Sequence, residues 1–175
     1  MGKKVLVVGG VAGGASVAAR VRRLDESAEI IMFERGPYVS FSNCCIPFHI
    51  SGDIEKSQDL VLMTPPEFDK QYNIDARVYN EVVAINKEEK TVEVKNVQTN
   101  ETYTESYDVL FLAPGAVALR PQSIEGINDE HVFVMKTVPD VEALTTYAKD
   151  NDVKDVTVVG GGYIGLEVAE NLKYA

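Results

Sequence analysis

The chain has 175 residues, of which 45% are hydrophobic and 25% charged, and its formal net charge is -10 at pH 7. This length suits one sizeable domain, or one domain with part of another. The acidic balance argues against nucleic acid or an anionic membrane surface as a partner, because phosphate binding requires a broad basic face. No apolar run is long enough to span a membrane. The two cysteines are adjacent and cannot form a disulfide framework, so we expect a reducing cytoplasm.

Residues 3 to 34 follow the order strand, glycine-rich turn, helix, strand. The aliphatic run at residues 5–8 is typical of a parallel strand buried on both faces. The turn at residues 9–14 then leads into a predicted helix, Ala12 to Leu24, whose apolar stripe is Val17, Val21 and Leu24. A second strand is predicted at residues 30–33 and is followed by Glu34.

This pattern favours a dinucleotide site. Glu34 comes twenty residues after Gly14, where such a unit needs a carboxylate to accept hydrogen bonds from the adenosine ribose. Gly9 and Gly14 occupy the first and third glycine positions, whereas Val11 replaces the middle glycine. The alternative is a tight turn without a ligand.

The predicted helix has a second face. Ser16, Arg20 and Arg23 recur at i, i+4 and i+7, about 100 degrees from the apolar stripe. This stripe of donors suits an anionic ligand. A solvated face on which charges balance is the alternative.

The segment from Gly36 to Gly52 is where we expect chemistry. Cys44 follows two helix-capping residue types, Ser42 and Asn43, and precedes a predicted short helix at residues 46–51. The unpaired amides of a helix amino terminus stabilise a thiolate. The alternative is that both cysteines are small buried hydrophobic residues.

Three runs in this order carry a resemblance to a known family: residues 9–14, residues 33–44, and Pro47 with Ser51-Gly52. Along its whole length the chain resembles the coenzyme A-disulfide reductases, in the single-cysteine branch of the flavin-dependent pyridine nucleotide-disulfide oxidoreductases. In that family one redox-active cysteine follows a Ser-Phe-x-Asn motif, which matches Cys44. The family usually has glycine where Cys45 stands, and its flavin turn has the form seen here at Val11.

The resemblance implies FAD and NAD(P)H as cofactors, a small thiol or disulfide, coenzyme A, as substrate, and a homodimer for the intact enzyme. It implies that coenzyme A contacts Ser16, Arg20, Arg23, Ser40 and Asn43. The implied flavin-binding residues are Gly9, Gly10, Val11, Ala12, Gly13, Gly14, Glu34, Arg35, Val82, Val83, Ala113, Pro114 and Gly115. Family members often have threonine at the position of Pro114.

The middle of the chain carries several further predicted elements. Two prolines begin a short helix that ends at Tyr72, with Phe68 and Tyr72 on one side. Strands are predicted at residues 74–78, 81–86, 107–112 and 131–135, a hairpin at residues 92–107, and a helix from Pro139. His49 and His131 have no second ligand at metal spacing, so we expect no metal site.

The pattern of strand and glycine-rich turn then recurs. A second buried strand is predicted at residues 156–159, before a complete turn with Gly160, Gly162 and Gly165. The helix that follows is expected to bury Leu166, Ala169 and Leu172. The resemblance implies that this turn binds the nicotinamide cofactor and that Glu167 lies near the nicotinamide.

Together these features predict an α/β fold, a three-layer FAD/NAD(P)-binding domain of glutathione-reductase type that is Rossmann-like and truncated. We expect a FAD-binding domain at residues 1–150, without its carboxyl-terminal return segment, and the first strand and helix of a NAD(P)-binding domain at residues 151–175. The expected activity is NAD(P)H-driven reduction of coenzyme A disulfide or a related persulfide or polysulfide, with residues 1–175 inactive by themselves. An NADH oxidase or peroxidase that uses a cysteine sulfenic acid, and a non-catalytic nucleotide-binding module, are the alternatives.

Overall fold

A computed structural model of the chain describes residues 2–175. The described residues divide into two compact units, the first formed by residues 2–41 and 61–115 and the second by residues 42–60 and 116–175. The predicted domain boundary at residue 150 concerns the domains of a longer protein, and it stays a prediction.

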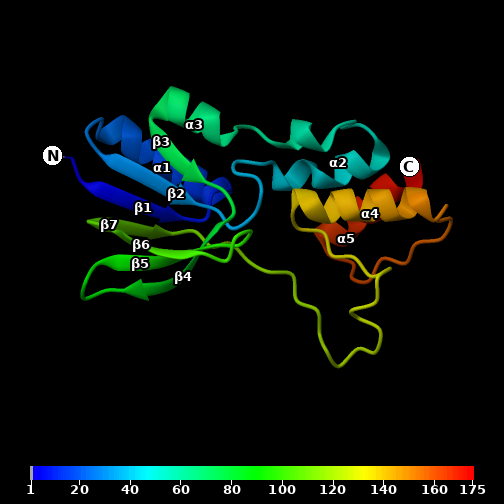
Figure 1. The fold of residues 1–175 in the computed structure, drawn as a ribbon. Coiled ribbons are helices and arrows are strands. Elements are labelled where there is room, and N and C mark those ends of the chain that lie inside the picture. The colour runs from blue at the N-terminus through cyan, green and yellow to red at the C-terminus, as the bar shows by residue number, and fades with distance from the viewer. Residues whose placement is uncertain (1) are drawn as a thin grey trace. The chain divides into compact units, whose positions relative to one another are not determined.

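The first unit contains two helices and two sheets (Figure 1). A four-stranded parallel sheet has the order β3-β2-β1-β7, and a three-stranded antiparallel sheet has the order β4-β5-β6. The elements are β1 (Lys4–Val8), α1 (Ala12–Leu24), β2 (Glu29–Phe33), α3 (Pro65–Tyr72), β3 (Ile74–Arg77), β4 (Asn80–Asn86), β5 (Thr91–Asn96), β6 (Thr102–Ser106) and β7 (Val109–Leu112).

Side chains of β1 and β2 point alternately to the two faces of the parallel sheet, and each face is covered by another layer. Val7 and Met32 are buried in the same cluster as Ala18 of α1 and Phe68 of α3. The neighbouring residues in each strand, such as Leu6, point to the other face and pack with residues of β5. The parallel sheet is therefore covered by helices on one face and by the antiparallel sheet on the other, as Figure 1 shows. The predicted three-layer α/β class is confirmed.

Two details of this unit differ from the predicted burial. In α1 the fully buried side chain is Ala18, while Leu24 is 69% exposed because it is the last residue of the helix, past the part that faces the sheet. The strand predicted at residues 107–112, which we expected to be buried, exists as β7, but Phe111 is 37% and Leu112 is 59% exposed. The reason is that β7 lies at the edge of the parallel sheet.

The short helix α3 forms as predicted, with Pro65 and Pro66 in its first turn. Thr64 and Glu67 also form a capping box, in which Glu67 Oε2 accepts from the Thr64 amide at 2.7 Å. Phe68 is buried, and its ring centroid lies 6.2 Å from that of Tyr72.

The second unit is helical. It contains the short 3₁₀ helices η1 (Asn43–Cys45) and η2 (Ser57–Leu60) and the α-helices α2 (Ile46–Ser51), α4 (Val138–Asp150) and α5 (Tyr163–Tyr174). The helix α2 packs against both α4 and α5 (Figure 1). A second capping box, formed by Thr137 and Asp140, begins α4 next to the predicted Pro139.

Both strands predicted in this unit are wrong. Residues 131–135 are not a strand, and the Arg120 guanidinium donates instead to the Val132 carbonyl at 3.0 Å. Residues 156–159 are also not a strand, and Val159 is 91% exposed. A strand needs a neighbour for its backbone hydrogen bonds, and no strand in the described residues 2–175 pairs with this segment.

The apolar face expected for α5 is wrong at two of its three residues. Leu166 is 60% exposed and Ala169 is exposed too, whereas Leu172 is half-buried. The buried residues of the helix are Val168 and Asn171. This difference follows from packing, because α5 lies against α2 rather than on a sheet of its own. No helix within residues 2–175 has the length and apolar character needed to cross a membrane.

Candidate functional site

The first glycine-rich turn brings the start of α1 against the end of β1. Gly9 has a φ of +95°, and a Cβ on Gly14 would lie 1.6 Å from the Gly9 carbonyl oxygen. Only glycine at position 14 allows this approach. The first amides of α1 have no acceptor inside the helix, so they face the space in front of the turn.

Glu34 lies at the carboxyl end of β2, where sequence reasoning expected a ribose acceptor. Its Oε2 accepts from the Gly10 amide at 2.9 Å, and its Oε1 accepts from the Gly36 amide at 2.8 Å. These two bonds fix the half-buried carboxylate beside the turn. Each oxygen keeps a lone pair for a ligand hydroxyl.

Gly10 has a packing role that the sequence did not reveal. A Cβ at this position would lie 2.6 Å from Cγ1 of Val39, which is fully buried. The amide of Ser40 also donates to the Gly10 carbonyl at 2.9 Å. The turn and the segment after β2 are therefore fitted to each other.

The turn at Ala113, Pro114 and Gly115 lies against the first glycine-rich turn. A Cβ on Gly9 would lie 2.0 Å from the Ala113 carbonyl oxygen, and the Ala113 amide donates to the Val8 carbonyl at 2.7 Å. Two segments that are about a hundred residues apart thus form one surface at the carboxyl end of β1 and β7. Ligands bind at this end of the strands in open α/β sheets.

Val82 and Val83 point in different directions because of a β-bulge in β4. The register with β5 shifts between Val82 and Ala84, so Val82 packs in the core while Val83 is 48% exposed. The bulge was not predicted. Arg35 is exposed and lies 3.8 Å from the Glu81 carboxylate.

Ser16, Arg20 and Arg23 are all exposed on α1, as the helical spacing predicts. Within residues 2–175 the side chains of Arg20 and Arg23 form no hydrogen bond or ion pair. Arg22 differs, because its guanidinium donates to the Tyr72 carbonyl at 2.7 Å and to the Asn73 carbonyl at 2.8 Å. Arg22 therefore has a structural role, whereas the guanidinium groups of Arg20 and Arg23 are available to a ligand.

Ser40 lies in the first unit and Asn43 in the second. Ser40 has a φ of +49°, which is a strained conformation for a residue other than glycine. Its carbonyl accepts from the Leu62 amide at 2.8 Å, which holds the residue in this conformation.

Cys44 is exposed in η1, and Cys45 is half-buried. Both are free thiols. Ser42 is the residue before η1, as expected, but neither it nor Asn43 caps the helix with its side chain. The Asn43 amide donates instead to the Lys136 carbonyl at 3.3 Å.

The second glycine-rich turn has the same backbone form as the first. Gly160 has a φ of +108°, and a Cβ on Gly165 would lie 2.1 Å from the Gly160 carbonyl oxygen. Gly162 is the residue before α5, and Glu167 is exposed one turn into this helix. The turn therefore forms although the strand expected before it does not.

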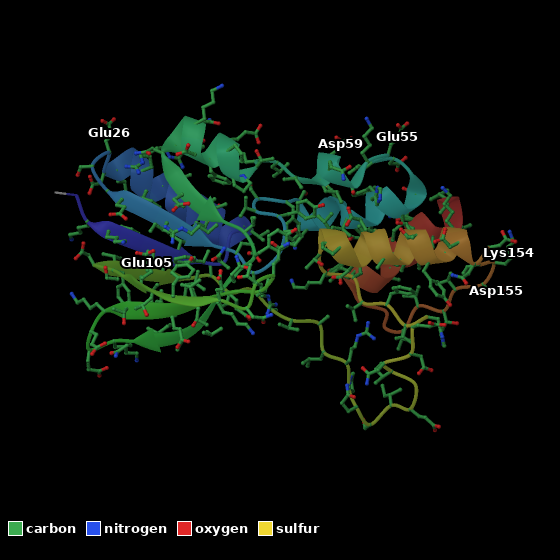
Figure 2. The ribbon with its side chains drawn as sticks, viewed as in Figure 1. Glu26, Glu55, Asp59, Glu105, Lys154 and Asp155 are labelled. Carbon is green, nitrogen blue, oxygen red and sulfur yellow. The ribbon has the colours of Figure 1, made fainter. Side chains whose placement is uncertain are left out.

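A partly buried cluster of charges joins the two sheets of the first unit, and sequence reasoning did not find it. Figure 2 labels Glu105 of β6, the centre of this cluster. Its carboxylate bonds to Lys4 of β1 at 2.5 Å and to Arg77 of β3 at 2.8 Å. Burial by itself raises the pKa of the Glu105 carboxyl, but the hydrogen bonds from Lys4 and Arg77 outweigh it and lower that pKa. The bond to Glu105 raises the pKa of Lys4.

No cluster of three potential metal ligands exists in residues 2–175. The His49 ring nitrogen Nδ1 bonds to the Ile54 carbonyl at 2.7 Å, which is a structural contact.

The first unit meets the needs of an adenine dinucleotide. Its two turns approach closely because Gly9 has no Cβ. It also provides the open amides of α1 and a carboxylate that is fixed at the end of β2. The model of the pyridine nucleotide-disulphide oxidoreductase family matches residues 3–175. The chain belongs to this family.

Relatives of known structure or activity lie within the family. The coenzyme A disulfide reductase of Staphylococcus epidermidis is 42% identical over 171 residues, which are 98% of this chain and 38% of the relative. The crystal structure of reduced Bacillus anthracis CoADR-RHD matches with a TM-score of 0.95 and 51% identity, over 99% of this chain and 31% of that one. A NAD-dependent persulfide reductase from A. fulgidus matches with a TM-score of 0.91 and 32% identity, over 98% of this chain and 32% of that one.

The predicted family resemblance is thus confirmed, and so is the Rossmann-like class of the fold. The chain spans 38% of the length of the curated relative.

Proposed function

We propose that this chain is part of a FAD-dependent, NAD(P)H-driven disulfide reductase that acts on coenzyme A disulfide or a related coenzyme A persulfide or polysulfide. The observation that carries the proposal is the exposed thiol of Cys44, in a chain whose first unit has the form of a dinucleotide site. The relatives named for coenzyme A disulfide reduction support this choice of substrate.

Cys44 is the proposed nucleophile. Its thiolate attacks one sulfur of coenzyme A disulfide, so the disulfide bond breaks, one coenzyme A leaves as a thiolate, and a mixed disulfide forms at Cys44. FAD, when bound and reduced by NAD(P)H, would supply two electrons; with them the mixed disulfide breaks, the second coenzyme A leaves as a thiolate, and Cys44 returns to its thiolate. Cys45 is half-buried and takes no part in this scheme.

The substrate contacts of the proposal are Ser16, Arg20, Arg23, Ser40 and Asn43. Arg20 and Arg23 suit phosphate groups, because both guanidinium groups are exposed and unpaired within residues 2–175. An acidic chain that leaves two arginines available on one helix face offers a local site for an anion.

The cofactor contacts of the proposal come from both glycine-rich turns. FAD is assigned to residues 9–14, Glu34, Arg35, Val82, Val83 and residues 113–115, and NAD(P)H to Gly160, Gly162, Gly165 and Glu167. We also propose a homodimer in a reducing cytoplasm. These assignments extend to the longer protein, of which residues 1–150 form the FAD-binding domain.

Steady-state assays of the full-length enzyme test the proposal. We expect coenzyme A disulfide to accelerate NADH or NADPH oxidation, the Cys44→Ser variant to lose at least ~10³-fold in rate, and the matched Cys45→Ser variant to keep most of it. If oxygen or peroxide accelerated NADH oxidation while coenzyme A disulfide and persulfides did not, the protein would be an oxidase or peroxidase instead. Loss of activity in Cys45→Ser but not in Cys44→Ser would mean that Cys45, and not Cys44, is the redox-active thiol.

A further inference from the structure

Residues 42–60 form a closed segment that carries Cys44, which we call the cysteine segment. The Ser42 amide donates to the Leu60 carbonyl at 2.8 Å, so both ends of the segment meet. Between these ends, α2 packs against α4 and α5 (Figure 1). The position of Cys44 therefore depends on what fixes this segment to its neighbours.

Two side chains of the cysteine segment hydrogen-bond to the start of α4. The Ser57 hydroxyl donates to Glu142 Oε1 at 2.5 Å, and Ser57 is only 8% exposed. At the other end of the segment, Asn43 Nδ2 donates to the Lys136 carbonyl at 3.3 Å. Asn43 directly precedes Cys44, so one of the two bonds acts next to the thiol.

The two acceptors, Glu142 in α4 and the Lys136 carbonyl just before this helix, are themselves fixed. Asp140 Oδ2 accepts from the Thr137 amide at 2.7 Å and from the Lys136 amide at 3.1 Å. These bonds hold the peptide whose carbonyl accepts from Asn43. Glu142 lies one residue after Val141, which is fully buried and anchors this turn of the helix.

We propose that Asn43 and Ser57 are positioning residues, through which α4 sets the place of the Cys44 thiol. The inference rests on the proposed function where it names Cys44 as the reacting group. It gives Asn43 a role beside the proposed substrate contact, because one N–H of its side-chain amide donates to the Lys136 carbonyl while the second N–H and Oδ1 stay available to a ligand. It also gives Glu142 a role that no spacing in the sequence indicates.

Alkylation of the 175-residue chain tests this inference without any substrate. A short pulse of iodoacetamide, read by peptide mass, gives the ratio of labelling at Cys44 to that at Cys45. We expect the ratio to fall about fivefold in Ser57→Ala and in Asn43→Ala, the change that corresponds to one hydrogen bond. Ser57→Thr keeps the hydroxyl and restores the ratio. Amide hydrogen exchange of residues 43–51 should rise in parallel.

Two further variants separate positioning from general loss of structure. Glu142→Gln keeps an acceptor for Ser57 and leaves the ratio near that of the parent chain, whereas Glu142→Ala lowers it. Asp59→Asn is the matched control, since Asp59 is exposed on the same short helix as Ser57 and its side chain points to solvent (Figure 2). If Ser57→Ala and Glu142→Ala both kept the parent ratio, the inference would be overturned.

Kinetics of the full-length enzyme provide the second readout. A positioning role predicts that Ser57→Ala, at a residue outside the proposed substrate contacts, lowers kcat about fivefold with KM for coenzyme A disulfide changed less than about twofold. A raised KM with unchanged kcat in Ser57→Ala would overturn the positioning role. If the parent enzyme did not reduce coenzyme A disulfide, the proposed function would fail, while the alkylation ratio would still decide the inference.

Discussion

At the scale of single residues, the first glycine-rich turn depends on the absence of one Cβ atom. The backbone of Gly14 approaches the Gly9 carbonyl so closely that any side chain at position 14 would overlap it. The close approach is what directs the first amides of α1 toward the space in front of the turn. We therefore expect stability and cofactor binding to depend on the same glycine.

Gly14→Ala tests this dependence. We expect the free energy of unfolding to fall by about 3 kcal/mol, because the backbone must shift to admit the new methyl group. Gly161→Ala is the control in the second turn, where a Cβ would meet no atom within 4 Å, and it should change the free energy by less than about 0.5 kcal/mol. Urea unfolding of both variants is the measurement. Equal stabilities for the two variants would contradict the argument.

Residues with a local pattern could be predicted, while residues with a distant partner could not. Glu34 and Gly14 follow from their spacing along one βαβ unit, and the structure places both at the turn. Arg22 and Arg23 look alike in sequence, yet only Arg22 reaches the carbonyl groups at the end of α3. The partner of Asn43 lies 93 residues away, so no local pattern reveals it.

At the scale of elements, Glu105 ties the antiparallel sheet to the parallel sheet of the first unit. Its carboxylate lies between two cations from β1 and β3, and Arg77 also lies 5.6 Å from the centre of the Phe33 ring. Since these bonds lower the pKa of Glu105, its ionised form stabilises the folded chain. The contribution is complete above the ordinary carboxyl pKa of about 4.3 and is lost as the pH falls through the lower pKa of the folded state.

Glu105→Gln should therefore destabilise the chain in a pH-dependent way. We expect a loss of about 1–2 kcal/mol at pH 7, between the values for exposed and buried ion pairs. This difference from the parent chain should shrink as the pH falls below about 4. The control is Glu29→Gln, which removes the 61% exposed partner of the same Lys4 and should cost less than about 0.5 kcal/mol. Urea titrations at several pH values measure both, and a pH-independent loss would refute the assignment.

Elements were predictable where their own residues make the stabilising contacts. The helix α3 begins at two prolines and buries Phe68, and both features follow from the sequence of the eight residues of this helix. The segment at residues 156–159 has the composition of a strand, but a strand forms only beside another strand. The buried face predicted for α5 is wrong for a similar reason, because this helix packs against α2 and not on a sheet.

At the scale of the whole molecule, the first unit has the groups that suit the ADP half of a dinucleotide. The glycine-rich turn, the fixed Glu34 carboxylate and the Ala113 turn are the groups that adenosine and a pyrophosphate need. We therefore expect the 175-residue chain to recognise FAD through its ADP half, and to oxidise no NAD(P)H by itself.

Competition binding with the 175-residue chain tests this expectation. ADP should displace FAD and bind within about tenfold of its affinity, whereas FMN, which lacks adenosine, should not compete. Glu34→Gln should weaken ADP binding about tenfold, since it removes the charge of the carboxylate that we propose accepts from the ribose hydroxyls. Glu26→Gln changes an exposed acid at the far end of α1 and is the matched control (Figure 2). The Glu34 variant also distinguishes the two glycine-rich turns, because ADP held at residues 160–165 would bind equally well with or without this carboxylate. Competition by FMN as strong as that by ADP would mean that this chain holds the flavin by its ring end, and the assignment of the first turn to the pyrophosphate would then be wrong.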